Sequence, residues 1–231
     1  YYNAGLAAVN SGKHEEAIKF FQKCADMKYL GVTPYFQISE SYLAMGDTVK
    51  AESVLTGLED KFPGDKNVKL NLIDLYIKSG KNDDALRLLG EAKAEDPSNF
   101  SLFFAEGIIY LNMLKYDEAI ACYDKALMLD PTSAVVLCDK GSALADAGMD
   151  LSAIECYESA VSFDAGYSPA WYALGVISFT TGDSERALMC FDNVLSLDPQ
   201  DIPAIIQKGN VLFSTGSYNE AVHYANMALS L

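Results

Sequence analysis

Adjacent carboxylates occur at several points of the sequence, and paired carboxylates can serve as a general acid and a general base. The pairs are Glu15–Glu16, Asp83–Asp84 and Asp117–Glu118. Each pair falls where a helix is expected to begin, and acidic side chains there offset the positive end of the helix dipole. The sequence also has no Ser/His/Asp ordering, no P-loop and no G-x-S-x-G motif. We therefore interpret the pairs as structural, and we predict no catalytic residues and no enzyme activity.

The thiols and imidazoles are arranged unlike those of a metal site. The cysteines are Cys24, Cys122, Cys138, Cys156 and Cys190. No C-x-x-C pair occurs, and His14 and His223 lie far apart, so we expect neither a bound metal nor another cofactor. Cys122, Cys156 and Cys190 recur at a constant interval, which on stacked helices is a separation of about 10 Å, too far for disulfides. Free, buried thiols favour a reducing compartment, and we expect a cytoplasmic location.

The charge of the chain limits the possible partners. The 231 residues carry a net charge of −15, so phosphate backbones are repelled and nucleic acid is not an expected ligand. Residues 1–115 hold 13 basic and 16 acidic side chains, whereas residues 116–231 hold 4 and 16. A basic partner would therefore be attracted to the second half. No apolar run reaches the roughly 18 residues of a membrane span, so membrane insertion is not expected.

Three ladders of small residues and prolines organise the chain. An alanine recurs at one fixed spacing, the repeat interval: Ala17, Ala51, Ala85, Ala119, Ala153, Ala187 and Ala221. A glycine stands at the same distance before most of these alanines: Gly12, Gly46, Gly80, Gly148, Gly182 and Gly216, with Leu114 in the fourth place. A proline stands at the same distance after four of them: Pro63, Pro97, Pro131 and Pro199. Glycine ends one helix, proline ends the next, and apolar positions between them follow the helical period, so each interval predicts a helix–turn–helix.

The spacing predicts one array over residues 1–231 with seven repeats. The expected repeats are 1–31, 32–65, 66–99, 100–133, 134–167, 168–201 and 202–231. A single helix pair cannot bury its apolar face, so the repeats must stack. Gly107, Gly141, Gly175 and Gly209 would let the paired helices approach closely.

The chain resembles the tetratricopeptide repeat family, whose pattern is W-x2-L-G-x2-Y, then A-x3-F, then A and P within one repeat. The sixth repeat carries the pattern most fully, in Trp171, Leu174, Gly175, Ala187, Phe191 and Pro199, although Ser178 replaces the usual tyrosine. The resemblance implies an all-α, right-handed superhelical solenoid. It also implies a non-catalytic scaffold that binds a protein or peptide partner, basic or apolar in character, in the concave groove.

In this family the first helices of successive repeats line the groove. Residues next to the motif positions then face the partner: Phe36, Glu40, Asn71, Asp74, Phe104, Ile108, Asn112, Asp139, Tyr172, Val176, Phe179, Gln207 and Asn210. Phe104 and Tyr172 would be anchors. The alternative is that many of these side chains pack between adjacent first helices as core. The expected groove has no Lys or Arg to clamp a C-terminal carboxylate as chaperone-binding members do, and both histidines are expected to lie outside it.

The last repeat is not followed by a capping helix in this sequence, which resembles an excised segment. We expect an exposed apolar end face that includes Val211, Val222 and Met227. Two alternatives to the scaffold therefore remain open. One is a self-assembling array or homo-oligomer that stacks through uncapped ends, and the other is a regulatory portion of a larger enzyme.

Overall fold

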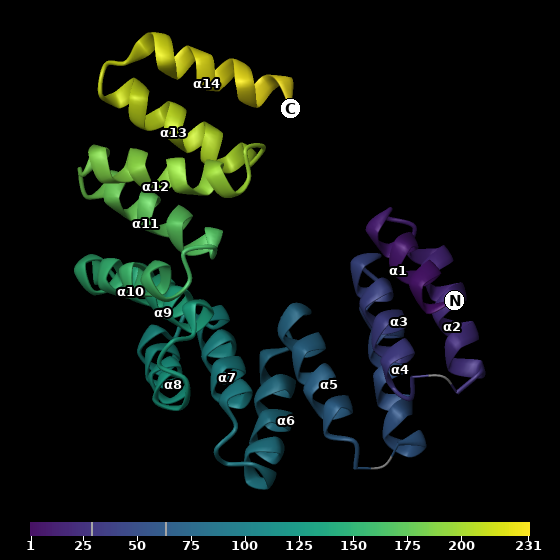
Figure 1. Ribbon diagram of the computed structural model, residues 1–231. Coiled ribbons are helices and arrows are strands. Elements are labelled where there is room, and N and C mark those ends of the chain that lie inside the picture. The colour runs from purple at the N-terminus through teal and green to yellow at the C-terminus, as the bar shows by residue number, and fades with distance from the viewer. Residues whose placement is uncertain (29, 63) are drawn as a thin grey trace. The chain divides into compact units, whose positions relative to one another are not determined.

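The computed structural model describes residues 1–28, 30–62 and 64–231. Within these ranges the secondary structure consists of α-helices joined by short turns, without a β-strand (Figure 1). The chain forms two compact units, Tyr1–Ala105 (unit 1) and Glu106–Leu231 (unit 2). The all-α prediction is confirmed. The right-handed superhelical course of the whole chain stays a prediction, and the proline expected to end the second repeat, Pro63, lies outside the described residues.

The described residues contain seven consecutive helix pairs (Figure 1). The pairs of the first three repeats are α1 (Tyr2–Asn10) and α2 (His14–Asp26), α3 (Thr33–Ala44) and α4 (Thr48–Lys61), and α5 (Lys66–Lys78) and α6 (Asn82–Glu95). The pairs of the next two are α7 (Phe100–Asn112) and α8 (Tyr116–Leu129), and α9 (Ala134–Asp146) and α10 (Asp150–Phe163). The last pairs are α11 (Ser168–Thr180) and α12 (Ser184–Leu197), and α13 (Ile202–Ser214) and α14 (Tyr218–Ser230). The boundary between the units falls within α7.

The turn inside each pair depends on a left-handed residue. Six of these turns carry glycine at positive φ, from 69° at Gly12 to 92° at Gly182. In the fourth repeat Leu114 takes the same conformation, with φ at 58°. A side chain with a Cβ is strained there because the Cβ approaches the following carbonyl oxygen. Leu114 is also exposed, so its side chain gains little from packing.

Leu114→Gly is therefore expected to raise the free energy of unfolding by about 1 kcal/mol. The reciprocal change in the next repeat, Gly148→Leu, should lower it by a similar amount, since Gly148 has φ at 78°. Urea denaturation followed by circular dichroism measures both changes. A destabilised Leu114→Gly protein would show that this turn is not strained.

In four of the described helix pairs an aromatic ring of the second helix packs directly against a glycine of the first. A Cβ on Gly141 would lie 2.7 Å from the ring of Tyr157, and one on Gly175 would lie 2.9 Å from the ring of Phe191. The sequence analysis did not single out Gly5, whose Cβ would lie 2.5 Å from the ring of Phe21. These glycines are therefore required by the close approach of the two helices.

In the second repeat Ser39 stands in place of the glycine, and the two helices are joined by a different contact. The Ser39 side chain is buried, and its hydroxyl donates a 2.9 Å hydrogen bond to the backbone carbonyl of Ala51 on α4. Ala51 is itself fully buried. A buried hydroxyl requires such a partner, so this bond holds the pair together where the sequence lacks glycine.

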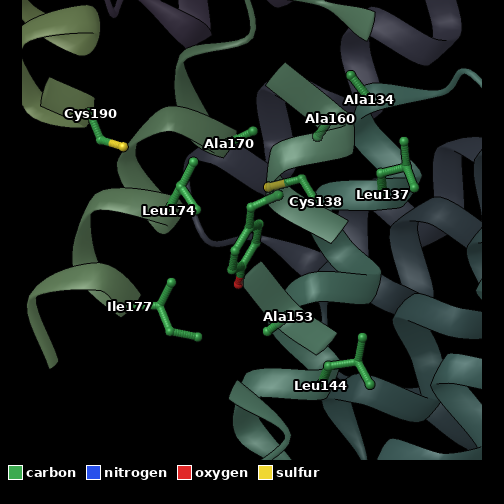
Figure 2. Close-up of a cluster of buried hydrophobic side chains, with 11 residues drawn as sticks. Ala134, Leu137, Cys138, Leu144, Ala153, Ala160, Ala170, Leu174, Ile177 and Cys190 are labelled. Atoms are coloured by element: carbon green, nitrogen blue, oxygen red, sulfur yellow. The ribbon is translucent and has the colours of Figure 1, made fainter. Parts of the chain in front are cut away.

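In unit 2 the cores of successive pairs merge. Figure 2 shows one such cluster, in which Leu137 and Cys138 of α9 lie among side chains of α10, α11 and α12. Burial raises the pKa of the Cys138 thiol to about 12 and that of Cys190 to about 11. Cys122 is buried as well, and Cys156 is half-buried. Cys138 and Cys190 therefore act as small apolar groups in the core, whereas the Cys122 thiol donates a 3.3 Å hydrogen bond to the Glu106 carboxylate.

Candidate protein-binding faces

In unit 1, α3 and α5 bring together four of the predicted groove residues. The residues Phe36, Glu40, Asn71 and Asp74 line one shallow depression. Phe36 and Asn71 are half-buried, whereas Glu40 and Asp74 are exposed. The fifth prediction for this unit, Phe104 on α7, is half-buried, and its ring stacks on Phe100 with centroids 6.3 Å apart. The arrangement offers an aromatic edge, an amide and two carboxylates on one face.

A lysine that the sequence analysis overlooked joins these carboxylates. The Lys78 ammonium lies 2.7 Å from Asp74 Oδ2 and 3.5 Å from Glu40 Oε1. Partial burial opposes its charge, but the hydrogen bonds and charges of the two carboxylates raise the pKa of Lys78 overall. The prediction that the groove has no Lys or Arg to clamp a C-terminal carboxylate stays a prediction, because Lys78 stands outside the positions considered and is already paired with two carboxylates. Lys78 escaped notice because it stands in the last turn of α5, one turn beyond Asp74.

A hollow of about 340 Å³ lies beside this group. Its walls include Val9, Leu43 and Ala44, with His14, Gln37, Glu40 and Lys78 as polar members. The sequence analysis placed His14 outside the groove, but its side chain lines this hollow together with Glu40, one of the predicted groove residues. The His14 Nδ1 atom is buried and has no hydrogen-bond partner among the described residues. The hollow therefore combines an apolar wall with a histidine and a carboxylate.

In unit 2 the predicted groove residues of α11 have one side in the core. Tyr172, Val176 and Phe179 are half-buried and pack against a cluster that includes Phe191 and Ala204. The rings of Tyr172 and Phe191 are 5.9 Å apart in an edge-on arrangement. These side chains therefore serve the stacking of repeats and also keep part of their surface exposed.

Two of the remaining predicted groove residues of unit 2 lie on α7 and two lie on α13. Ile108 is half-buried, and Asn112 is exposed at the end of α7. On α13, Gln207 is half-buried and accepts a 3.4 Å hydrogen bond from the exposed Asn210 amide. The sequence analysis predicted an exposed end face that includes Val211, Val222 and Met227. The prediction was wrong for Val211, which is fully buried against the preceding repeat, whereas Val222 is exposed. Met227, half-buried, is not part of the apolar hollow there.

Asp139 on α9 has the most perturbed carboxyl group. It is half-buried, and it has neither an ion pair nor a hydrogen bond within the described part of the chain. Removal from water raises its pKa from 3.8 to about 6. An unpaired carboxylate in such a position favours a ligand that supplies a positive charge or a hydrogen-bond donor.

The adjacent carboxylates of the sequence lie in the first turns of second helices. Glu15 and Glu16 are in the first turn of α2, and Asp83 and Asp84 are in the first turn of α6, all exposed. No cluster of three metal-binding side chains occurs among the described residues. In the same residues, every helix is too short or too polar to cross a bilayer.

Consecutive helix pairs that pack on one another within each unit define an α-helical repeat protein. Models of the tetratricopeptide repeat match residues 42–105, residues 102–133, and residues 1–29 together with 168–201. The chain belongs to the tetratricopeptide repeat family, as its repeat pattern predicts. No curated protein sequence gives a significant match.

Solved structures with similar folds support the assignment. A crystal structure of MamA is 27% identical, with a TM-score of 0.63, over 69% of this chain and 93% of its own. PilF of Pseudomonas aeruginosa is 22% identical, with a TM-score of 0.66, over 71% and 75%. A tetratricopeptide repeat protein of Parabacteroides merdae is 14% identical, with a TM-score of 0.68, over 98% and 90%. The last two show the fold alone. The family and the fold together identify a protein–protein interaction scaffold.

Proposed function

We propose that the inner faces of the first helices bind a segment of a partner protein, and that the chain contributes binding rather than chemistry. The observation that carries the proposal is the group on α3 and α5, where Phe36 and Asn71 lie beside the charges of Glu40, Asp74 and Lys78. Exposed aromatic and polar side chains on one concave surface are typical of peptide recognition.

The chemistry of the face favours a segment that has a basic side chain next to an apolar one. Two carboxylates share the single ammonium of Lys78, so the group keeps a net negative charge. A basic residue can displace Lys78 from one carboxylate while an apolar neighbour covers the exposed edge of Phe36. In unit 2, the carboxylate of Asp139 offers a second acceptor for a positive charge.

A charge-reversal experiment tests the proposal. Affinity capture from source-cell lysate with the wild-type chain identifies a partner, whose dissociation constant is then measured with purified proteins. Glu40→Lys/Asp74→Lys is expected to weaken binding at least tenfold, because it repels a basic segment. The matched control is Glu91→Lys/Glu95→Lys, which reverses two exposed carboxylates of α6 that are also ion-paired.

Equal affinities for the two double variants would contradict the proposal. Recovery of the chain itself as the main captured protein, lost in Glu40→Lys/Asp74→Lys, would favour the self-assembling array instead. Charge reversal is preferred to truncation of Tyr172 or Phe179, since both rings pack against the core and their removal would also destabilise unit 2.

A further inference from the structure

The hollow of about 340 Å³ that Glu40 and Lys78 help to line has room for an aromatic ring. A closed apolar cavity of about 150 Å³ already binds benzene. The apolar wall of the hollow consists of Val9 of α1 and of Leu43 and Ala44 of α3. Ala44 is exposed and the other two are half-buried, so a ligand can reach this wall from solvent. An apolar wall with a few polar groups beside it is typical of a binding pocket.

Two polar side chains of the hollow have hydrogen-bonding capacity to offer a ligand. The amide nitrogen of Gln37 donates a 3.4 Å hydrogen bond to Glu40 Oε2, whereas the amide oxygen of Gln37 receives no hydrogen bond within the described residues. The Lys78 ammonium lies 2.7 Å from Asp74 but 3.5 Å from Glu40. The longer contact, to Glu40, is therefore the one that a basic residue of a partner displaces, and this displacement frees a donor of Lys78.

A phenol hydroxyl matches both groups. It donates one hydrogen bond, which the amide oxygen of Gln37 can accept, and it accepts another, which the Lys78 ammonium can donate. The ring of phenylalanine has no polar atom, and the indole of tryptophan donates but does not accept. The side chain that combines a ring for the apolar wall with this pair of hydrogen bonds is that of tyrosine.

The spacing between such a tyrosine and the basic residue follows from residues that the two sites share. Glu40 and Leu43 line both the hollow and the depression that contains Phe36 and Asp74. On an extended segment, side chains two positions apart point to the same side and are separated by about 7 Å. Such a pair can enter the two sites together, whereas immediate neighbours point to opposite sides of the segment.

We propose that the hollow is a specificity pocket for a tyrosine of the partner segment, two positions away from the basic residue that binds Glu40 and Asp74. The phenol ring covers the apolar wall, and its hydroxyl lies between Gln37 and Lys78. This inference rests on the proposed function and deepens it, because it names the apolar side chain of the segment and gives it a position.

A library of random peptides displayed on phage is the probe, and it is selected on the wild-type chain. We expect tyrosine to be enriched about tenfold over the starting library at two positions from Lys or Arg, since aromatic anchors dominate such interfaces. A selected peptide is then synthesised, and its affinity is measured by fluorescence anisotropy. Replacing its tyrosine by phenylalanine should weaken binding about threefold to tenfold, because the hydroxyl loses its hydrogen bonds.

Variants of the chain separate the pocket from the carboxylates. Ala44→Phe places a ring over the hollow, so it should abolish the enrichment of tyrosine and leave that of the basic residue. The matched control is Ala94→Phe, at an exposed alanine in the last turn of α6, which should keep both enrichments. Glu40→Lys/Asp74→Lys should abolish the enrichment of the basic residue. Both alanines are exposed, so the phenylalanine variants should keep the urea midpoint of the wild type.

The outcomes distinguish the pocket from the proposed function. Enrichment of a basic residue without tyrosine at the stated spacing would overturn the inference and leave the proposed function standing. Tyrosine enrichment that persists in Ala44→Phe, or equal affinities of the tyrosine and phenylalanine peptides, would overturn it as well. If the wild-type chain selects no basic residue at all, the proposed function fails, and the inference that rests on it fails too.

Discussion

Gly107→Ala and Gly141→Ala are expected to lower the free energy of unfolding by about 2 kcal/mol each, because both overpack a helix contact. The Cβ added at Gly141 would lie 2.7 Å from a ring carbon of Tyr157. The distance from a Cβ added at Gly107 to the nearest ring carbon of Tyr123 would be shorter still. Non-bonded carbons pack at about 3.5 to 4 Å, so a buried ring or a helix must move. Overpacking of this kind costs about 1 to 3 kcal/mol, and the better helix propensity of alanine returns no more than about 1 kcal/mol.

The same position in the last repeat supplies the control. A Cβ at Gly209 would meet its nearest neighbour at 3.5 Å, an ordinary contact, so Gly209→Ala should be neutral or stabilising by up to about 1 kcal/mol. The stability change of Gly175→Ala should fall between those of Gly141→Ala and Gly209→Ala, because its Cβ would lie 2.9 Å from the ring of Phe191. Urea denaturation midpoints give the order. A neutral Gly107→Ala, or a Gly209→Ala protein destabilised as strongly, would refute the role assigned to these glycines.

Asp139→Asn is expected to stabilise the protein at pH 7.5 by on the order of 2 kcal/mol. Burial raises the pKa of Asp139 from 3.8 to about 6, so the folded chain holds this proton more tightly than the unfolded chain does. The group therefore adds no penalty below pH 4, and its penalty grows as the pH rises to 6 and stays constant above. The amide of asparagine carries no charge and removes this dependence.

The difference in unfolding free energy between wild type and Asp139→Asn, measured from pH 4 to pH 7.5, tests this account. The difference should be small at pH 4 and largest above pH 6. Asp146→Asn on the same helix is the control, and because Asp146 is exposed, its difference should be small throughout. A difference for Asp139→Asn that does not vary with pH would show that the carboxyl group is not desolvated.

The helix pairs could be predicted from the sequence because the features that define them are local. The second helices begin one repeat interval apart from His14 to Tyr218, as the alanine ladder requires. The alanines themselves, such as Ala17 and Ala187, are fully buried. Glycine at the turn and alanine at the contact each have a conformational or steric reason, so their spacing alone specifies the repeat.

The side-chain contacts between repeats could not be predicted in the same way. The Lys78–Glu40 ion pair joins α5 to α3, and His14 at the start of α2 lines a hollow together with residues of α3. Both depend on how far neighbouring helices are displaced, which the repeat period does not specify. Val211 was assigned to the wrong face for the same reason, because a helix buries residues on its stacking side as well as on its pair side.

The roles of Gly5 and Ala225, by contrast, could have been inferred from the sequence. Gly5 stands one repeat interval before Ser39 and three before Gly107, so the glycine position extends into the first repeat. Ala225 stands one repeat interval after Phe191, where repeats four to six have an aromatic ring. Comparison of every repeat at these two positions would have revealed both the close helix contact and the apolar hollow on α13 and α14.

Site-specific photo-crosslinking in intact source cells tests most directly whether the inner face binds a partner. A benzophenone amino acid replaces Glu40 or Asn71 on the inner face, or Arg87 or Glu91 on α6, in otherwise wild-type full-length protein. We predict a discrete crosslinked product at positions 40 and 71 and none at 87 and 91. Crosslinks confined to positions 87 and 91 would contradict the claim and would place the binding surface on the second helices.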